Sequence, residues 1–337
     1  MARVNDIVLA RAPLRIALGG GGTDLHSHYG EHGGFVVSGA INRYVRMRIS
    51  GAQGELFQLA HLETEQVADP TEIAHPILRA AITRHGDGRP LDLSSDGDVE
   101  PGTGLGSSGA YAVCAVKAVG MAAGRDLAGG ELAEAACAIE IEDAGRTVGK
   151  QDQYASAHGG VNSFTFARDG TVEVQRLDLP DQVHEALRDH FLLFYTGQSR
   201  SAAHILSGQV ERTLAGDAEL ERNLLRACAA ARESSRALEA GDLDATAGLM
   251  NEHWALKRER LAGVAMPRIE QLRELALRGG ARAAMLMGAG GGGYLLAYAP
   301  DPEPVRTALA TAGAPELTFD LDLDGCVGRV AANGELG

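Results

Sequence analysis

The stretch PGTGLGSSGA, residues 101–110, carries the strongest structural signal in the chain. Its four glycines allow left-handed backbone and close approach to a ligand. Apolar residues follow with helical spacing to about 123, so a helix should begin near Ser107. A glycine-rich loop that leads into a helix N-terminus offers free N–H groups and the positive end of the helix dipole, which together bind phosphate. We therefore predict a phosphate-binding loop.

Two familiar kinds of nucleotide loop fit this stretch poorly. The sequence has no GxxxxGK[ST] motif, so the loop is not a Walker A loop. Gly104, Gly106 and Gly109 have GxGxxG spacing, but a dinucleotide-binding loop needs a buried strand directly before it, and residues 94–101 are polar and acidic. Of the two serines, one could cap the helix while the other binds Mg²⁺ beside nucleotide phosphates.

Two more glycine clusters flank this loop in the sequence, GGGGTD at 19–24 and GAGGGG at 288–293. Tight turns would explain any one cluster. Three clusters in one chain favour a site for a polyanion or a sugar, because such ligands need close backbone approach.

Carboxylates follow the phosphate loop. Glu140 and Asp143 are three residues apart in a helical pattern over 130–144, so they share a face, which could also be a solvated acidic surface. Asp152 lies in GKQDQY at 149–154, at an expected helix start. It could be a helix cap, or a base for a sugar hydroxyl that the helix dipole keeps ionised.

The order of the predicted elements indicates an α+β fold. Strands dominate the first half, whereas long helices occupy about 201–261 and strands return near the end. Strands and helices do not alternate regularly, which argues against a doubly wound sheet. The length of 337 residues suggests two domains, with a boundary near 185–190.

Composition excludes several classes of protein. The net charge of −14 leaves no overall basic footprint for nucleic acid, so an anionic ligand would need a local site. No apolar run approaches 18 residues and the N-terminus lacks a signal-like apolar segment, so we expect a cytoplasmic protein without a membrane partner. The four cysteines are far apart and are expected to be buried free thiols.

The three glycine motifs, in this order, resemble those of the GHMP kinase superfamily of galacto-, homoserine, mevalonate and phosphomevalonate kinases. Residues 11–24 resemble the acceptor-binding motif, 101–110 the phosphate loop, and 287–293 the third motif, which packs against that loop and the substrate. The resemblance implies a two-domain fold. Residues 1–188 would form an N-terminal domain like domain 2 of ribosomal protein S5, and 189–337 a ferredoxin-like α/β domain.

The resemblance also implies roles for individual residues, with ATP and Mg²⁺ as cofactors. Asp152 would be the catalytic base, with Arg15 beside it, and Ser108 and Glu140 would bind Mg²⁺. The ATP phosphates would lie on Pro101, Gly102, Gly104, Leu105, Gly106, Ser107, Ser108 and Gly109. The acceptor would lie on Gly21, Gly22, Thr23, Asp24, Lys150, Gln153, Gly159, Gly160, Gly290 and Gly291.

Within the superfamily, GGGTD, GKQDQY and YTGQSRS at 195–201 are most similar to the D-glycero-D-manno-heptose 7-phosphate kinases. Galactokinases carry Glu-His where this chain has Gly21-Gly22, and a missing carboxylate would remove repulsion against an anionic acceptor. The resemblance implies an ATP-dependent 1-kinase that makes the 1,7-bisphosphate for nucleotide-heptose synthesis. We hypothesise that loop amides with Lys150, Arg200 or Arg15 hold the 7-phosphate. A kinase of a free fucose- or galactose-like sugar, or a catalytically silent sugar sensor, is the alternative.

Three histidines form HxHxxxH directly after the first glycine cluster, at His26, His28 and His32. Such spacing could hold Zn²⁺, although no cysteine or carboxylate motif supports it. Contacts to sugar hydroxyls or a surface role are the other readings.

Overall fold

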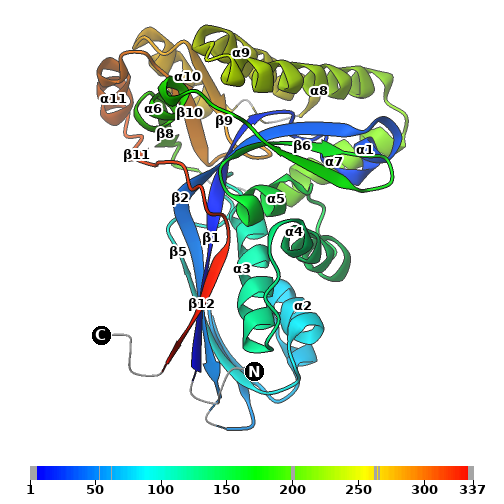
Figure 1. The fold of residues 1–337 in the computed structure, drawn as a ribbon. Helices are drawn as coiled ribbons and strands as arrows, with labels where there is room; N and C mark the ends of the chain where they lie inside the picture. The colour runs from blue at the N-terminus through cyan, green and yellow to red at the C-terminus, as the bar shows by residue number, and fades with distance from the viewer. Residues whose placement is uncertain are drawn as a thin grey trace.

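The computed structural model describes residues 6–52, 54–61, 63–198, 202–261, 264 and 266–332. These residues form two sheets with helices packed around them (Figure 1). The larger sheet has the order β12-β1-β2-β5-β3-β4, with β6 pairing to β2 and β7 to β6. Its strands are β1 (Asp6–Gly19), β2 (Gly34–Gly51), β3 (Phe57–Ala60), β4 (Thr64–Val67), β5 (Leu91–Gly97), β6 (Val161–Phe166), β7 (Val172–Arg176) and β12 (Val327–Ala332).

The helices of the first half cover one face of this sheet. The central one, α3 (Ser107–Ala122), is buried almost all round because its residues are mainly Ala, Val and Gly, and it contacts both β1 and β2. Around it lie α2 (Pro76–His85), α4 (Gly129–Cys137), a π-helical turn η2 (Ala138–Asp143) and α5 (Gln151–His158), with η1 (Pro70–Glu72) next to α2. The short helix α1 (His26–His32) lies apart from α3 and contacts helices of the second half.

The second half builds a smaller antiparallel sheet of order β11-β8-β10-β9. Its helices α8 and α9 also contact strands of the larger sheet, and residues of both halves line one cavity. The elements are α6 (Asp181–Asp189), β8 (Phe191–Tyr195), α7 (Ala202–Leu214), α8 (Ala218–Glu239), α9 (Leu243–Arg260), α10 (Pro267–Arg278), β9 (Ala283–Leu286), β10 (Tyr294–Tyr298), α11 (Pro302–Thr311) and β11 (Glu316–Leu317).

The predicted α+β class is confirmed, but the division of the chain needs a correction. The smaller sheet begins at β8, close to the expected boundary at 188. The last strand, β12, pairs antiparallel with β1 from Asp6↔Ala332 to Arg11↔Val327. Residues 189–337 are therefore not one continuous domain, because the chain returns to the first sheet. This return covers an edge of β1 whose N–H and C=O groups would otherwise lack partners.

Other differences are local. Residues 34–51 form one long strand, β2, which is fully buried over 34–41 and only partly buried over 42–44. The helix expected over 130–144 ends as α4 and continues as the π-helical turn η2. No helix among the described residues is long and apolar enough to cross a bilayer.

Removing a side chain from the larger core should cost much more than removing an exposed one. Leu14 is 1% exposed and lies at a register shift between β1 and β2, where the strands cannot easily close a gap. We expect Leu14→Ala to lower the free energy of unfolding by about 2–5 kcal/mol. Val330→Ala on β12, where the side chain is 50% exposed, should change it by less than about 0.5 kcal/mol. Urea titration followed by circular dichroism measures both, and equal losses would contradict this account of the core.

Candidate active site

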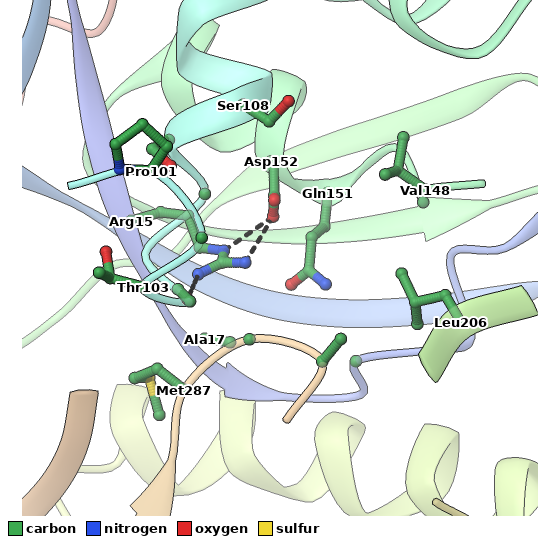
Figure 2. A pocket seen from close by; sticks show the side chains of 18 of the residues that line it. Arg15, Ala17, Pro101, Thr103, Ser108, Val148, Gln151, Asp152, Leu206 and Met287 are labelled. Atoms are coloured by element: carbon green, nitrogen blue, oxygen red, sulfur yellow. Dashed lines mark hydrogen bonds and ion pairs between the residues drawn. The ribbon is translucent and has the colours of Figure 1, made fainter. Parts of the chain in front are cut away.

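A cavity of about 1040 Å³ lies between the two halves of the molecule. All three glycine clusters line it, together with the start of α5 and one face of α9. Figure 2 shows the Arg15–Asp152 pair between Ser108 on one side of the cavity and Met287 on the other. The glycine motifs, separated by up to 270 residues in the sequence, therefore meet at one site.

The loop before α3 has the conformation that its glycines predict. Gly102, Gly104 and Gly106 have positive φ angles of 77°, 84° and 76°. Gly106 is the N-cap of α3, so no capping side chain covers the first N–H groups of the helix. Ser107 is the first helical residue, and the expectation that it caps the helix is wrong. The open N-terminus remains able to bind an anion.

The third glycine cluster packs directly on this loop. A Cβ atom at Gly104 would lie 2.6 Å from the carbonyl oxygen of Met287, so only glycine permits the contact. The Tyr294 N–H also donates a hydrogen bond to the Thr103 carbonyl at 3.1 Å. Two loops from different sheets thus touch through their backbones and close one wall of the cavity.

Asp152 and Arg15 form an ion pair on this wall. Asp152 lies in the first turn of α5, and its Oδ1 accepts bonds from Arg15 Nε at 2.8 Å and from Nη2 at 2.7 Å. Arg15 Nη1 donates to the Gly104 carbonyl at 2.5 Å. The arginine is buried, so one guanidinium fixes both the carboxylate and the phosphate loop (Figure 2).

Two glycines let the phosphate loop approach this carboxylate. A Cβ at Gly106 would lie 3.3 Å from Asp152 Cγ, and one at Gly109 would lie 2.6 Å from Asp152 Cβ. Real Cβ atoms do not approach as closely as the contact at Gly109 would require, while the contact at Gly106 would be tight and its φ of 76° favours glycine, so glycine at both positions lets Asp152 lie against the first turn of α3. The spacing between Asp152 and the phosphate loop is set here.

Asp24 is the second carboxylate of the cavity. It is buried and accepts backbone hydrogen bonds from Gly22 at 3.0 Å and from Gln151 at 3.1 Å. Burial raises the pKa of its carboxyl, and the nearby charge of Asp152 adds to the effect, while the backbone donors oppose it. Its neighbour Thr23 bonds the Gly20 and Phe35 carbonyls and holds the loop rather than facing the cavity.

Comparison with known proteins assigns the family. Models described as "GHMP kinases N terminal domain" and "GHMP kinases C terminal" match residues 72–160 and 234–314, together about half of the chain. The chain belongs to the GHMP kinase family. It is therefore a phosphotransferase with an alcohol group as acceptor, and ATP is the phosphate donor in this family.

Several relatives differ in the acceptor that their names state. A D-glycero-alpha-D-manno-heptose 7-phosphate kinase from Campylobacter jejuni is 26% identical, over 86% of this chain and 89% of that protein. A mevalonate kinase from Thermococcus gammatolerans is 25% identical, over 90% and 88%. A bifunctional fucokinase/GDP-fucose pyrophosphorylase from Arabidopsis thaliana is 26% identical over 87% of this chain and 30% of that protein.

The fold is also that of solved GHMP kinases. The crystal structure of a D-glycero-D-manno-heptose 1-phosphate kinase from Bacteroides thetaiotaomicron superposes with a TM-score of 0.78 at 23% identity, covering 96% of this chain and 98% of that one. At this identity the likeness shows the fold alone, and it confirms the GHMP kinase architecture inferred from the motifs.

The residues implied as Mg²⁺ ligands come together and suit the ion. Ser108 Oγ donates to Glu140 Oε1, and Gln153 Nε2 donates to Glu140 Oε2 at 2.7 Å. Burial raises the pKa of Glu140, although the Ser108 hydroxyl and the charge of Arg146 oppose this. A hydroxyl and one carboxylate are hard oxygen donors of the kind that Mg²⁺ combines with substrate phosphates.

In this structure the guanidinium of Arg146 lies beside the Glu140 carboxylate, where a metal ion would bind. Its Nη1 donates to Ser108 Oγ and lies 3.4 Å from Glu140 Oε1. Its side chain is 42% exposed, so it can move into solvent. Ser108 and Glu140 would then be free to hold a metal ion, which in phosphoryl transfer bridges and neutralises the phosphate oxygens.

Not every implied residue reaches the cavity. Lys150 Nζ bonds Glu134 at 2.9 Å and the Gly170 carbonyl at 3.0 Å, outside the cavity wall. Gly159 and Gly160 pack against the segment 322–325 and Arg176 instead. Lys150, Gly159 and Gly160 therefore do not line the acceptor site in this structure.

Some of the other implied residues line the cavity, and others lie behind its wall. Gln153 lines the cavity, but its amide bonds Glu140, and Gly290 lines it while Gly291 does not. Leu105 and Gly109 support the loop from inside. Arg200, the remaining candidate phosphate ligand, lies outside the described residues. The cavity wall includes Gly21, Gly22, Asp24, Pro101, Gly102, Gly104, Gly106, Ser107 and Ser108.

The histidines after Asp24 do not converge. His26 packs edge-on to Tyr29, whereas His28 faces His32 with ring centroids 5.2 Å apart. The described residues contain no group of three His, Cys, Asp or Glu side chains placed to hold a metal ion. The zinc interpretation therefore has no support among them.

Two cations on α9, the half-buried Lys257 and the buried Arg260, were not predicted from the sequence. Lys257 Nζ bonds the Leu286 carbonyl at 2.8 Å and also the Gly288 carbonyl, and Arg260 Nη2 bonds the Gly21 carbonyl at 2.6 Å. Both line the cavity. Their three-residue spacing in a helix rich in charges gave no signal, because nothing local distinguishes them from the surface Arg258.

The glycine contact with Asp152 is open to a direct test. Gly109→Ala should push Asp152 away from the loop and lower kcat by at least about tenfold, since small misplacements at a reacting centre cost large factors. The matched control is Gly130→Ala in α4, where a Cβ meets nothing within 4 Å. It should retain wild-type kcat and slightly raise thermal stability. Equal kcat in both variants would contradict the role given to this contact.

Lys257 should make stability depend on pH. Burial, with the charges of Arg260 and Arg15, lowers its pKa to about 7, against about 10.4 in an unfolded chain. Between these values the unfolded state binds the extra proton, so wild-type stability should rise with pH relative to Lys257→Met, by about 1.4 kcal/mol per pH unit. Denaturant titrations from pH 6 to 9 measure the difference. Parallel pH profiles would show that this lysine titrates normally.

Proposed function

We propose that the protein is an ATP-dependent kinase that transfers the γ-phosphoryl group to the anomeric hydroxyl of D-glycero-D-manno-heptose 7-phosphate. The observation that carries the proposal is the Arg15–Asp152 pair, held against the phosphate loop in a cavity that also contains Asp24. The heptose 7-phosphate kinase of Campylobacter jejuni supports the choice of acceptor, because the likeness extends over 86% of the chain.

In the proposed site the two ligands occupy different walls. ATP places its phosphates at the start of α3, where the open N-terminus and the loop amides offset negative charge. The sugar lies between Asp24 and Asp152, with a ring hydroxyl on Asp24 and O1 facing Asp152. The bound metal ion, held by Ser108 and Glu140, would supply charge neutralisation at the phosphates.

The residues of the chain then have a limited chemical task. Asp152 accepts the proton of the anomeric hydroxyl, O1 forms a bond to the γ-phosphorus, and the bond from that phosphorus to the β–γ bridging oxygen breaks, so ADP leaves. Arg15 occupies Oδ1 of Asp152 and thereby fixes the direction of the other oxygen. Positioning and charge stabilisation provide most of the rate enhancement in such transfers.

A kinase of a free sugar is the alternative. The bifunctional fucokinase/GDP-fucose pyrophosphorylase of Arabidopsis thaliana is 26% identical to this chain, as is the heptose 7-phosphate kinase, and the mevalonate kinase of Thermococcus gammatolerans is 25% identical. Release of ADP from Mg-ATP should therefore be measured with heptose 7-phosphate, mannose 6-phosphate, fucose, galactose and mevalonate. Turnover on the heptose phosphate, with the free sugars inert, is expected; turnover on fucose or galactose alone would overturn the choice of acceptor.

Removing the base should separate binding from chemistry. Asp152→Asn keeps the shape of the side chain but cannot accept the proton, so kcat should fall by about 10²–10⁴-fold while the Kd for ATP changes little. Single-turnover kinetics and calorimetric ATP titration give the two quantities. A kcat near that of the wild type would reject Asp152 as the base.

A further inference from the structure

Helix α9 presents two cations to the acceptor side of the cavity. Lys257 and Arg260 are one helical turn apart, so they share a face. Arg260 is 8% exposed, and both residues line the cavity. Within the described part of the chain neither forms an ion pair with a carboxylate within 4.0 Å. An unpaired buried cation is costly, so such a pair needs an explanation.

Arg260 is held under the first glycine loop but keeps donor capacity. Nη2 bonds the Gly21 carbonyl at 2.6 Å and Nη1 lies 3.4 Å from Asn223 Oδ1, whereas the buried Nε has no partner. Gln209 of α7 reaches the same loop, where its Nε2 bonds the Gly22 carbonyl at 3.0 Å and its buried Oε1 is unpartnered. Both side chains retain polar atoms that an added ligand could satisfy after a small shift.

The local charge contrasts with that of the whole protein. The chain has a net charge of −14, yet the acceptor side of the cavity gathers three cations, Arg15, Lys257 and Arg260. Two carboxylates oppose them there, Asp152 and Asp24. Asp152 is engaged by Arg15, and Asp24 is bound by backbone N–H groups, which leaves the α9 cations to attract a further anion.

We propose that Lys257 and Arg260 form a subsite for an anionic group on the acceptor, a phosphomonoester at the end of the sugar remote from the reacting hydroxyl. This inference rests on the proposed function and identifies the residues that select a phosphorylated sugar. It replaces Lys150, whose ammonium group is engaged by Glu134.

The order of charges along the cavity fits a substrate of this shape. The Asp24 carboxylate accepts from the N–H of Gln151, which precedes Asp152, and from the N–H of Gly22, whose neighbour Gly21 accepts from Arg260. Asp24 therefore bridges the segment that carries Asp152 and the loop that Arg260 holds. A sugar with O1 at Asp152 and a hydroxyl at Asp24 would direct its far end toward Arg260. Burial lowers the pKa of Arg260 to about 10, so the guanidinium stays charged near neutral pH, and a bound dianion would offset the cost of burying that charge.

The test compares a phosphorylated and a free form of one sugar. The ratio of kcat/KM for heptose 7-phosphate to that for unphosphorylated heptose should fall by about 10- to 100-fold in Arg260→Gln and in Lys257→Met, because charge-assisted hydrogen bonds to the phosphate are lost. Arg260→Lys should recover part of the ratio. Arg258→Gln is the matched control on the same helix, since Arg258 is half exposed and faces Glu270, and its ratio should equal that of the wild type.

The wild type distinguishes the two proposals. If it prefers the free sugar, the proposed function fails before any variant is considered. If it prefers the phosphate and both α9 variants keep the full preference, the subsite is wrong while the function stands. Should the variants not fold, as judged by thermal melting, inorganic phosphate decides: at saturating Mg-ATP it should inhibit the wild type competitively with heptose 7-phosphate. Noncompetitive inhibition, or none, would overturn the subsite.

Discussion

Contact between two backbones, that of the phosphate loop and that of the third glycine cluster, is the constraint on which the site depends. The Gly104 backbone meets Met287 and Gly288 where no side chain could be accommodated. The two loops belong to different halves of the molecule, so their contact fixes how the halves meet and where the cavity lies. Arg15 then connects the same loop to Asp152, and Lys257 binds carbonyls of the third cluster from the other side. Backbone atoms therefore take part in each of these contacts with the two loops.

The charged side chains in this site differ in the partners that they have. Arg15 is neutralised by Asp152, and Glu140 is surrounded by donors from Ser108, Gln153 and Arg146. Lys257 and Arg260 bond only neutral oxygens in the described structure. The first set of charged groups has its partners within the protein, whereas the two α9 cations would obtain a charged partner from a bound ligand. In an acidic protein, cations that the fold leaves without a carboxylate partner make attraction for anions local to the part of the cavity around α9.

The sequence predicted those features of the site that depend on residues close together in the chain. The phosphate loop and the start of α3 were predictable, because glycine conformation and helix geometry act over a few residues. The pairing of Ser108 with Glu140 was implied only by the family resemblance, because the two residues are remote in the sequence. Other contacts set by tertiary packing were not predicted. Lys150 stands next to the site in sequence but binds Glu134, whereas Lys257 and Arg260 are remote in sequence and line the cavity. The pairing of β12 with β1 likewise depends on the chain returning across the whole fold. Family resemblance carried over the motifs, which are short, and could not carry over these long-range contacts.

The position of β12 also bears on how the chain is made. Its partner β1 is synthesised well before β12, because most of the other helices and strands lie between them in the sequence. The edge of β1 that β12 covers therefore stays open until β12 has emerged from the ribosome. Domains usually fold as units in order of synthesis, N-terminal first. Here the sheet that contains β1 must wait for β12, so a nascent polypeptide that stops before Val327 would expose the edge of β1 to other chains.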